Sequence, residues 1–320
     1  MGGAIDRDGA WSEVVELAQR YSARVWTAPM TGRCAFPEDH PLFAGFLPAM
    51  REGIVERLGG HDVIFVIGAP AFTYHVEGSG PHVPEGAKLC QLIDDPDIAA
   101  WTPVGTSVVG SIRLGVVDLL ARPARGERAA PPLRAPPRRA EPSSPITVAF
   151  ALQTLAEVRD PGDVVVEEAP TARPVMQAYL PITRAEGFYT MDSGGLGYSM
   201  PAAVGVALGR PGVRVIGLIG DGSSLYSIQA LWSAAQLKLP ITYVILNNGR
   251  YAALQDFAPV FGFARGEAVQ GTELPGLDFV ALARGMGCQA VRVTQADKLQ
   301  NALAQALSAR APMLVEVVVA

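Results

Sequence analysis

The sequence predicts an α/β protein made of two doubly wound parallel-sheet domains. Short apolar runs alternate with segments of helical periodicity in both halves of the chain, and one stretch rich in proline and arginine separates the halves. A chain of 320 residues has room for about two domains with sizeable cores. We expect domains at residues 1–121 and 146–320, joined by a linker at 122–145.

The pattern of the first half predicts a Rossmann-like parallel sheet. Apolar segments at 23–28, 63–67 and 88–93 alternate with helical stretches at 11–21 and 49–58. The stretch 122–145 lacks apolar periodicity and predicts an extended, mobile connector. Its arginines could touch nucleic acid, but the net charge of −5 and the absence of interleaved aromatic residues favour a solvated connector and no nucleic-acid partner.

The second half predicts a doubly wound domain. Its expected helices and strands lie at 148–158, 163–167, 279–286, 289–293, 297–309 and 313–319. Residues 256–277 exceed the usual loop length and predict an active-site cover or short helices.

A βαβ unit at 213–246 carries the most informative pattern. Two apolar runs, 213–219 and 241–246, flank a helical pattern at 223–239. Parallel strands end at the same sheet edge, so Asp221 and Asn248, which follow the two runs, should converge where ligands bind.

The residues at this edge suit a divalent cation and a phosphate. Gly220 and Gly222 let the backbone approach a phosphate closely, and a helix start offers free N–H groups. Asp221 and Asn248 supply one anionic and one neutral oxygen, a sparse set typical of Mg²⁺ and less suited to calcium. The alternative is an ordinary βαβ turn.

The span GDGSSLYSIQALWSAAQLKLPITYVILNN resembles the signature of the thiamine diphosphate (ThDP) enzymes. The resemblance implies that Asp221, the Asn248 side chain and the Arg250 carbonyl hold Mg²⁺. It also implies that the backbone at 222–224 contacts the diphosphate. The cofactor-binding residues it implies in this unit are Gly220, Asp221, Gly222, Ser223, Ser224, Asn248 and Tyr251.

A second glycine cluster, Gly194, Gly195, Leu196 and Gly197, leads into a helix of small residues. It fails the dinucleotide fingerprint because Met200 stands where the third glycine belongs. In the family a similar segment lies beneath the cofactor, so the resemblance implies that Leu196 is an apolar wedge against the cofactor rings. The alternative is that Leu196 is a core leucine. Tyr251, beside the second strand end, is either part of a pocket wall or part of the core.

Within the superfamily the chain resembles the benzoylformate decarboxylases over nearly its whole length, in segments such as APMTGRCAFPEDHPLFAGFLPA and NNGRYAALQDFA. This implies that His40 transfers protons, a role that suits an imidazole. The alternative is a loop histidine that caps the backbone before Pro41. The resemblance also places Thr190, Ala253 and Phe257 in the substrate pocket, although Thr190 replaces an aromatic residue of that enzyme.

The amino end departs from the family. Members begin with a pyrimidine-binding domain that carries an activating glutamate, and residues 1–3 instead correspond to the end of the first strand of the middle domain. Glu167 and Glu168 are expected to be solvated or structural. We therefore expect a homo-oligomer, or a partner that supplies the pyrimidine-binding domain.

The resemblance implies a ThDP- and Mg²⁺-dependent decarboxylase of an aromatic or branched 2-oxo acid, truncated and inactive if nothing supplies the absent domain. The alternatives are an acetolactate synthase-like carboligase and a noncatalytic ThDP-binding remnant. Composition agrees with a cytoplasmic enzyme without a membrane partner: no apolar run reaches the ~18 residues that span a bilayer, no signal segment begins the chain, and the three cysteines have unrelated spacings.

Overall fold

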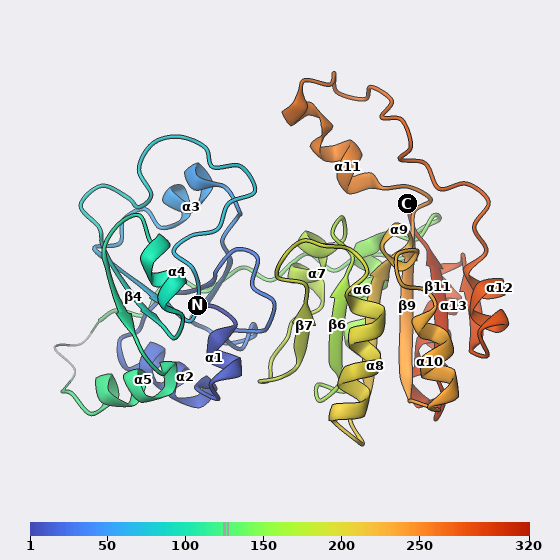
Figure 1. Cartoon of the computed structure of the whole chain (residues 1–320), viewed down its shortest axis with the longest axis horizontal. Helices are drawn as coiled ribbons and strands as arrows, with labels where there is room; N and C mark the ends of the chain where they lie inside the picture. Colours follow the sequence, from blue (N-terminus) through green and yellow to red (C-terminus); the bar gives the residue numbers. More distant parts are fainter. Residues whose placement is uncertain (124–125, 127) are drawn as a thin grey trace. The chain divides into compact units, whose positions relative to one another are not determined.

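The computed structural model describes residues 1–123, 126 and 128–320, which form two compact units (Figure 1). The first unit holds Met1–Ala135 with Ile182–Phe188, and the second holds Pro136–Pro181 with Tyr189–Ala320. Both units are α/β with parallel strands, which confirms the predicted fold class. Three residues of the predicted linker, 124, 125 and 127, lie outside the described residues.

The second unit is built on a six-stranded sheet with the strand order β10-β11-β9-β8-β6-β7. The pairs from β10 to β6 are all parallel, so these five strands end at one edge. The strands are β6 (Val164–Glu168), β7 (Phe188–Thr190), β8 (Val215–Gly220), β9 (Ile241–Asn247), β10 (Gln289–Val293) and β11 (Met313–Val318).

Helices cover both faces of this sheet, which explains why its strands are apolar without alternation. One face packs on α8 (Ser199–Gly209), α10 (Ala230–Gln236) and α12 (Phe279–Gly285). On the other face lies α13 (Ala296–Ser308), where Thr242 donates to the Ala306 carbonyl at 2.9 Å. Beside α13 packs α6 (Val148–Val158), and α7 (Arg173–Tyr179) packs against α6.

The prediction of a single helix at 223–239 is wrong. The structure has α9 (Asp221–Ser224), a run of turns, and then α10. The Ser224 hydroxyl donates to the Asp221 carbonyl at 2.7 Å, and Ser227 N–H donates to the Ser224 carbonyl at 3.2 Å. A serine side chain that bonds to nearby backbone competes with the helical ladder, and the chain tightens into turns there.

The long segment that follows β9 contains the short helices that the sequence allowed. They are α11 (Ala252–Phe257) and the 3₁₀ turn η1 (Ala258–Phe261). Its role as a cover stays a prediction. The end of the expected linker is extended but attached to the second unit, because the Gln153 side chain bonds both backbone groups of Ala140, at 2.8 and 3.2 Å.

The first unit has its strands in two pieces rather than in one sheet, so the expectation of a single Rossmann-like sheet is only partly met. β1 (Val25–Thr27) pairs with β2 (Phe43–Phe46), and β3 (Val63–Ile67) pairs with β4 (Lys88–Ile93) and then β5 (Thr106–Val109), all in parallel. The helices are α1 (Ala4–Arg7), α2 (Trp11–Arg20), α3 (Arg51–Arg57), α4 (Pro96–Trp101) and α5 (Ile112–Leu120).

Only one of the three cysteines is expected to react quickly with a thiol reagent. Burial raises the pKa of Cys34 to about 12 and that of Cys288 to about 11, whereas Cys90 is exposed. Thiolate is the nucleophile, so the two buried thiols should be inert in the folded protein. Titration with a disulfide reagent at pH 8 should give one rapid equivalent, and two more only after denaturation. Three rapid equivalents would contradict the packing described.

None of the described helices has both the length and the apolar character needed to cross a bilayer.

Candidate functional site

The ends of β8 and β9 meet through Asp221. Its carboxylate accepts hydrogen bonds from the N–H groups of Gly222 at 2.7 Å, Asn248 at 3.1 Å and Gly249 at 2.7 Å. The last two donors follow β9, on the neighbouring strand. The parallel pairing of β8 and β9 thus joins residues 27 positions apart, as the βαβ pattern required.

Asp221 is a buried anion whose hydrogen-bond donors are backbone N–H groups. It is 4% exposed, and within the described residues no lysine or arginine forms an ion pair with it. Burial raises its pKa, and the backbone N–H bonds offset part of that rise. A buried carboxylate without a cation is costly, so a divalent ion at this position would compensate it. The residues present therefore fit a metal.

The other two implied metal ligands lie on the same loop. The Asn248 amide oxygen accepts from the Arg250 N–H at 3.2 Å and keeps a second lone pair. Arg250 forms an antiparallel bridge with Glu273. One backbone hydrogen bond lies on each side of this bridge: Leu274 N–H donates to the Gly249 carbonyl at 2.8 Å, and Tyr251 N–H donates to the Thr272 carbonyl at 2.7 Å. In this antiparallel pattern the Arg250 carbonyl points away from Glu273. The metal role of these oxygens stays a prediction.

Gly222 is required by the ring of Tyr251. A Cβ at position 222 would lie 2.3 Å from Tyr251 Cε1. The side chains of Ser223 and Ser224 are buried, and the Ser224 hydroxyl is bonded to the Asp221 carbonyl. The Ser224 hydroxyl is therefore engaged, and the contact of the backbone at 222–224 with a diphosphate stays a prediction.

The predicted glycine turn is held by a carboxylate that sequence reasoning missed. Gly194 and Gly197 have φ of +74° and +98°, the left-handed region that glycine adopts without strain. Glu168, at the end of β6, accepts from the N–H groups of Gly197 and Ser199, both at 2.6 Å. Burial raises its pKa, and these N–H bonds lower it. Glu168 thus fixes the turn that carries Leu196.

The expectation that Glu167 and Glu168 are solvated is wrong; they are 0% and 1% exposed, and their structural alternative holds. Glu167 forms an ion pair with Arg173, and Thr190 donates to it at 3.0 Å. β6 lies between β8 and β7, so both of its edges are paired, and α8 packs against one of its faces. The sequence feature that could have indicated this burial is the pair of consecutive acidic residues at the end of an otherwise apolar strand.

Replacing Glu168 with glutamine should loosen the glycine turn. One of the two N–H groups would face the amide NH₂ instead of an acceptor, and a buried unpaired donor costs about 1–3 kcal/mol. We expect a roughly tenfold loss of ThDP affinity, measured by calorimetry with Mg²⁺ present. Glu157→Gln is the matched control, because Glu157 lies in a largely exposed ion pair with Arg139. Equal affinities for the two variants would contradict the role of Glu168.

The three implied substrate-pocket residues lie on two elements. Thr190 ends β7, is 4% exposed, and has its hydroxyl engaged with Glu167 and Arg173. Ala253 and Phe257 lie on α11, where Phe257 is 39% exposed and contacts the ring of Phe261 at 5.5 Å between centroids. The pocket assignment stays a prediction.

His40 belongs to the first unit and caps local backbone. Leu42 N–H donates to its Nδ1 at 3.1 Å, so in the neutral ring Nε2 carries the proton. The Gln19 side-chain amide lies 3.0 Å from Nε2, and its oxygen is the atom that can accept there. The capping alternative is thus observed, while the proton-transfer role stays a prediction.

Two family models together match most of the chain. Residues 1–119 match the central domain of thiamine pyrophosphate enzymes, and residues 171–317 match their C-terminal TPP-binding domain. The second match contains Asp221, Asn248 and the glycine turn.

Named relatives agree with these matches. The chain is 39% identical over 318 residues to a benzoylformate decarboxylase of Pseudomonas aeruginosa, covering 99% of this chain and 60% of that protein. It is 28% identical to an acetolactate synthase of Arthrospira platensis, covering 99% of this chain and 57% of that protein.

Solved structures give the same result. A thiamine diphosphate-dependent 4-hydroxybenzoylformate decarboxylase of Rhodococcus jostii superposes with a TM-score of 0.94 at 37% identity. The benzoylformate decarboxylase of Polynucleobacter necessarius gives 0.95 at 37% identity. Each alignment covers 99% of this chain and 60% of the other. The chain thus spans about 60% of the length of these relatives.

Proposed function

Because the chain belongs to the thiamine pyrophosphate enzymes, we propose that it binds ThDP with Mg²⁺ and takes part in decarboxylating an aromatic or branched 2-oxo acid. The observation that carries the proposal is the buried Asp221 carboxylate, held between the ends of β8 and β9 without a cationic partner among the described residues. The likeness to benzoylformate decarboxylases over 99% of the chain supports the choice of reaction. The activity of the whole enzyme is part of this proposal.

The residues of the second unit would hold the cofactor. Asp221, Asn248 and the Arg250 carbonyl would bind the metal, and the backbone at 222–224 would contact the diphosphate. When bound, ThDP supplies an electron sink for the pair released as CO₂ departs. Glu168 would keep the Gly194–Gly197 turn in place, and Leu196 on that turn would support the cofactor.

The protein's further tasks are to hold the substrate and to move a proton. Thr190, Ala253 and Phe257 would contact the group attached to the 2-oxo acid. His40, whose Nδ1 accepts from the Leu42 N–H and leaves Nε2 to carry the proton of a neutral ring, would exchange a proton with the reacting carbon. A 2-oxo acid is therefore the expected small-molecule partner.

A carboligase of the acetolactate synthase kind is the second candidate, favoured by an alignment to that relative over 99% of the chain. Both candidates share the cofactor site, so the products distinguish them. Benzoylformate converted to benzaldehyde and CO₂ supports the decarboxylase, and pyruvate converted to acetolactate supports the carboligase.

Calorimetry tests the shared premise. We expect ThDP to bind the full chain when Mg²⁺ is present and to bind much more weakly in excess chelator. Binding without CO₂ release from either substrate would favour a noncatalytic ThDP-binding protein. No binding of ThDP with Mg²⁺ would refute the proposed function.

A further inference from the structure

The chain between β3 and β4 contains a loop that contacts the start of α3. Tyr74 and Val83, near the two ends of this loop, pack against a buried apolar cluster of the first unit. Residues 75–81 between them are all exposed. A segment with so few buried apolar contacts has a low free energy of local opening unless polar contacts hold it. The position of the 74–83 loop therefore depends on its polar contacts.

The first two residues of α3 supply these polar contacts. Arg51 donates to the Gly80 carbonyl at 3.0 Å and forms an ion pair with Glu77 at 2.6 Å. Glu52 accepts from the N–H and the hydroxyl of Ser79, at 2.8 and 3.3 Å. The exposed middle of the 74–83 loop is thus held by two adjacent side chains of opposite charge.

The closed loop leaves one donor of Arg51 unpaired. The Arg51 side chain is 9% exposed, and its buried Nε has no hydrogen-bond partner within the described residues. A buried donor without an acceptor is costly, and water would reach this one if the loop moved away. The closed position therefore carries a penalty that opening would relieve.

Tyr74 connects Arg51 with a histidine of the loop. The guanidinium carbon of Arg51 lies 5.5 Å from the centre of the Tyr74 ring, and the Tyr74 hydroxyl lies 3.0 Å from Nδ1 of His82. A neutral His82 suits this place, because its ring bonds the hydroxyl without adding charge. A protonated His82 would put a second cation beside the same tyrosine.

The charged groups that act on His82 are Arg51 of α3 and Glu77 of the loop. Glu77 already pairs with Arg51, so this one carboxylate would face two cations if His82 gained a proton. Burial and the Arg51 charge lower the pKa of His82, and Glu77 offsets only part of that change. The closed loop therefore favours the neutral ring.

We propose that the charge of His82 controls the 74–83 loop, which is closed over the start of α3 when His82 is neutral and opens when His82 carries a proton. The closed state should be fully favoured above the ordinary histidine pKa of about 6.5. It should lose stability as the pH falls below that value, toward the lowered pKa of His82.

The contact between Glu52 and Ser79 should not itself respond to this change of pH. The Ser79 N–H bond lowers the pKa of the Glu52 carboxyl, so Glu52 keeps its charge where a histidine titrates. Arg51 stays charged at every pH of interest. A loss of the Ser79 bond in mild acid would therefore report the charge on His82.

Amide hydrogen exchange of Ser79 in the full chain is the first readout. It is expressed as a protection factor at each pH, which removes the pH dependence of exchange itself. We expect the Ser79 protection factor to fall several-fold between pH 7.5 and pH 5. That of Lys88, which donates to the Asp62 carbonyl at 2.9 Å at the start of β4, should stay unchanged. His82→Gln is neutral at both pH values and should keep the loop closed at both.

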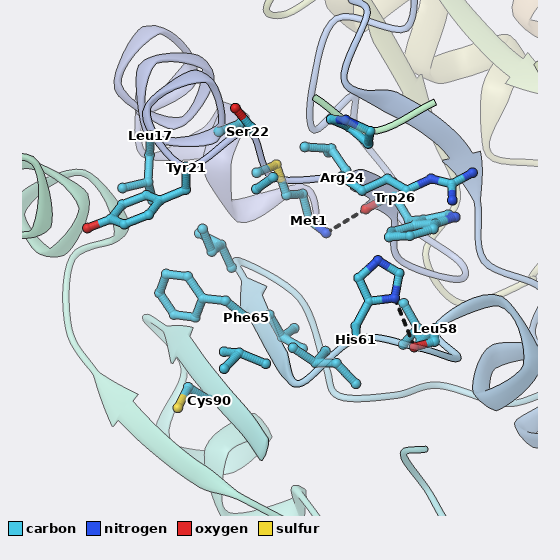
Figure 2. A pocket seen from close by; sticks show the side chains of 18 of the residues that line it. Met1, Leu17, Tyr21, Ser22, Arg24, Trp26, Leu58, His61, Phe65 and Cys90 are labelled. Carbon is cyan, nitrogen blue, oxygen red and sulfur yellow. Dashed lines mark hydrogen bonds between the residues drawn. The ribbon is translucent and has the colours of Figure 1, made fainter. Parts of the chain in front are cut away.

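Two further variants sharpen this comparison. His82→Lys carries a lasting charge and should open the loop already at pH 7.5. His61→Gln is the matched control, because the His61 Nδ1 lies 3.0 and 3.1 Å from the carbonyls of Leu58 and Gly59, and Figure 2 shows the first of these bonds. Carbonyls only accept, so Nδ1 of His61 carries a proton in either charge state. His61→Gln should therefore keep the pH dependence of the parent chain at Ser79.

Cleavage by a glutamate-specific protease is the second readout. Glu77 lies in the loop, and its side chain must leave Arg51 before a protease can bind it. Glu141 is exposed and lies outside the loop, so the ratio of cleavage at Glu77 to cleavage at Glu141 removes the pH dependence of the protease. We expect this ratio to rise several-fold at pH 5 in the parent chain, and at pH 7.5 in His82→Lys.

An unchanged Ser79 protection factor or an unchanged cleavage ratio between the two pH values would overturn the proposal. An equal change in His82→Gln would also overturn it, and so would a closed loop in folded His82→Lys at pH 7.5. The parent chain and His82→Gln decide the question even if His82→Lys does not fold. The test requires no ThDP, so its outcome is independent of the proposed function.

Discussion

Replacing Asp221 with asparagine should abolish metal-dependent binding of ThDP. The change removes the carboxylate that joins the ends of β8 and β9 and leaves a neutral group of the same size. Loss of an indirect partner of a metal ligand costs ~10- to 100-fold in metal affinity, so loss of the one acidic ligand should cost more than ~100-fold. Calorimetric titration of ThDP into the protein with Mg²⁺ measures the effect.

The folded state should survive this substitution. Burial opposes the charge on Asp221 and raises its pKa, so a neutral side chain removes that penalty. The gain offsets the loss of about 1–3 kcal/mol where the new amide NH₂ faces a backbone N–H group that the carboxylate accepted. The control is Asp297→Asn, at an exposed carboxylate that pairs with Lys298. Thermal melting without ligands should show Asp221→Asn still folded, and Asp297→Asn should bind ThDP normally. Unchanged Mg²⁺-dependent affinity in Asp221→Asn would remove this residue from the metal site.

Replacing His40 with alanine should slow CO₂ release by roughly 10²- to 10⁴-fold, the usual size of a general acid–base contribution. The physical reason is that a ring nitrogen of an imidazole can both give and accept a proton, so the side chain can exchange the proton that the product requires. Initial rates from benzoylformate at saturating ThDP and Mg²⁺ measure the effect. KM should change much less than kcat.

The unfolding free energy of His40→Ala tests the capping role of His40 independently of the reaction rate. The Leu42 N–H loses its acceptor in His40→Ala, which should cost about 1 kcal/mol of unfolding free energy. His75→Ala is the matched control, since His75 is exposed and its side chain has no assigned role. A loss of stability with an unchanged rate would leave His40 as a backbone cap only.

The sequence predicts correctly that Asp221 and Asn248 meet at one edge of the sheet, because their meeting follows from topology. Parallel strands joined by a crossover helix must end on the same side, and the apolar runs before Asp221 and Asn248 mark those strands clearly. The glycine cluster at 194–197 also marks a turn in the sequence, because few residues other than glycine adopt the left-handed backbone found at Gly194 and Gly197.

Other features depend on neighbours that periodicity does not reveal. Glu168 looks like a solvated strand end until the glycine turn is known to fold over it and to donate the Gly197 and Ser199 N–H groups to its carboxylate. The break between α9 and α10 depends on a serine hydroxyl that bonds backbone instead of solvent.

The most direct test of the metal site is a crystal structure of the full chain with ThDP and Mn²⁺ in place of Mg²⁺, read by anomalous scattering. The account predicts one manganese peak at direct coordination distance, roughly 2.0–2.2 Å, from the Asp221 carboxylate, the Asn248 amide oxygen and the Arg250 carbonyl, with diphosphate oxygens completing the shell. A peak elsewhere, or bound ThDP whose diphosphate lies away from the ends of β8 and β9, would contradict it.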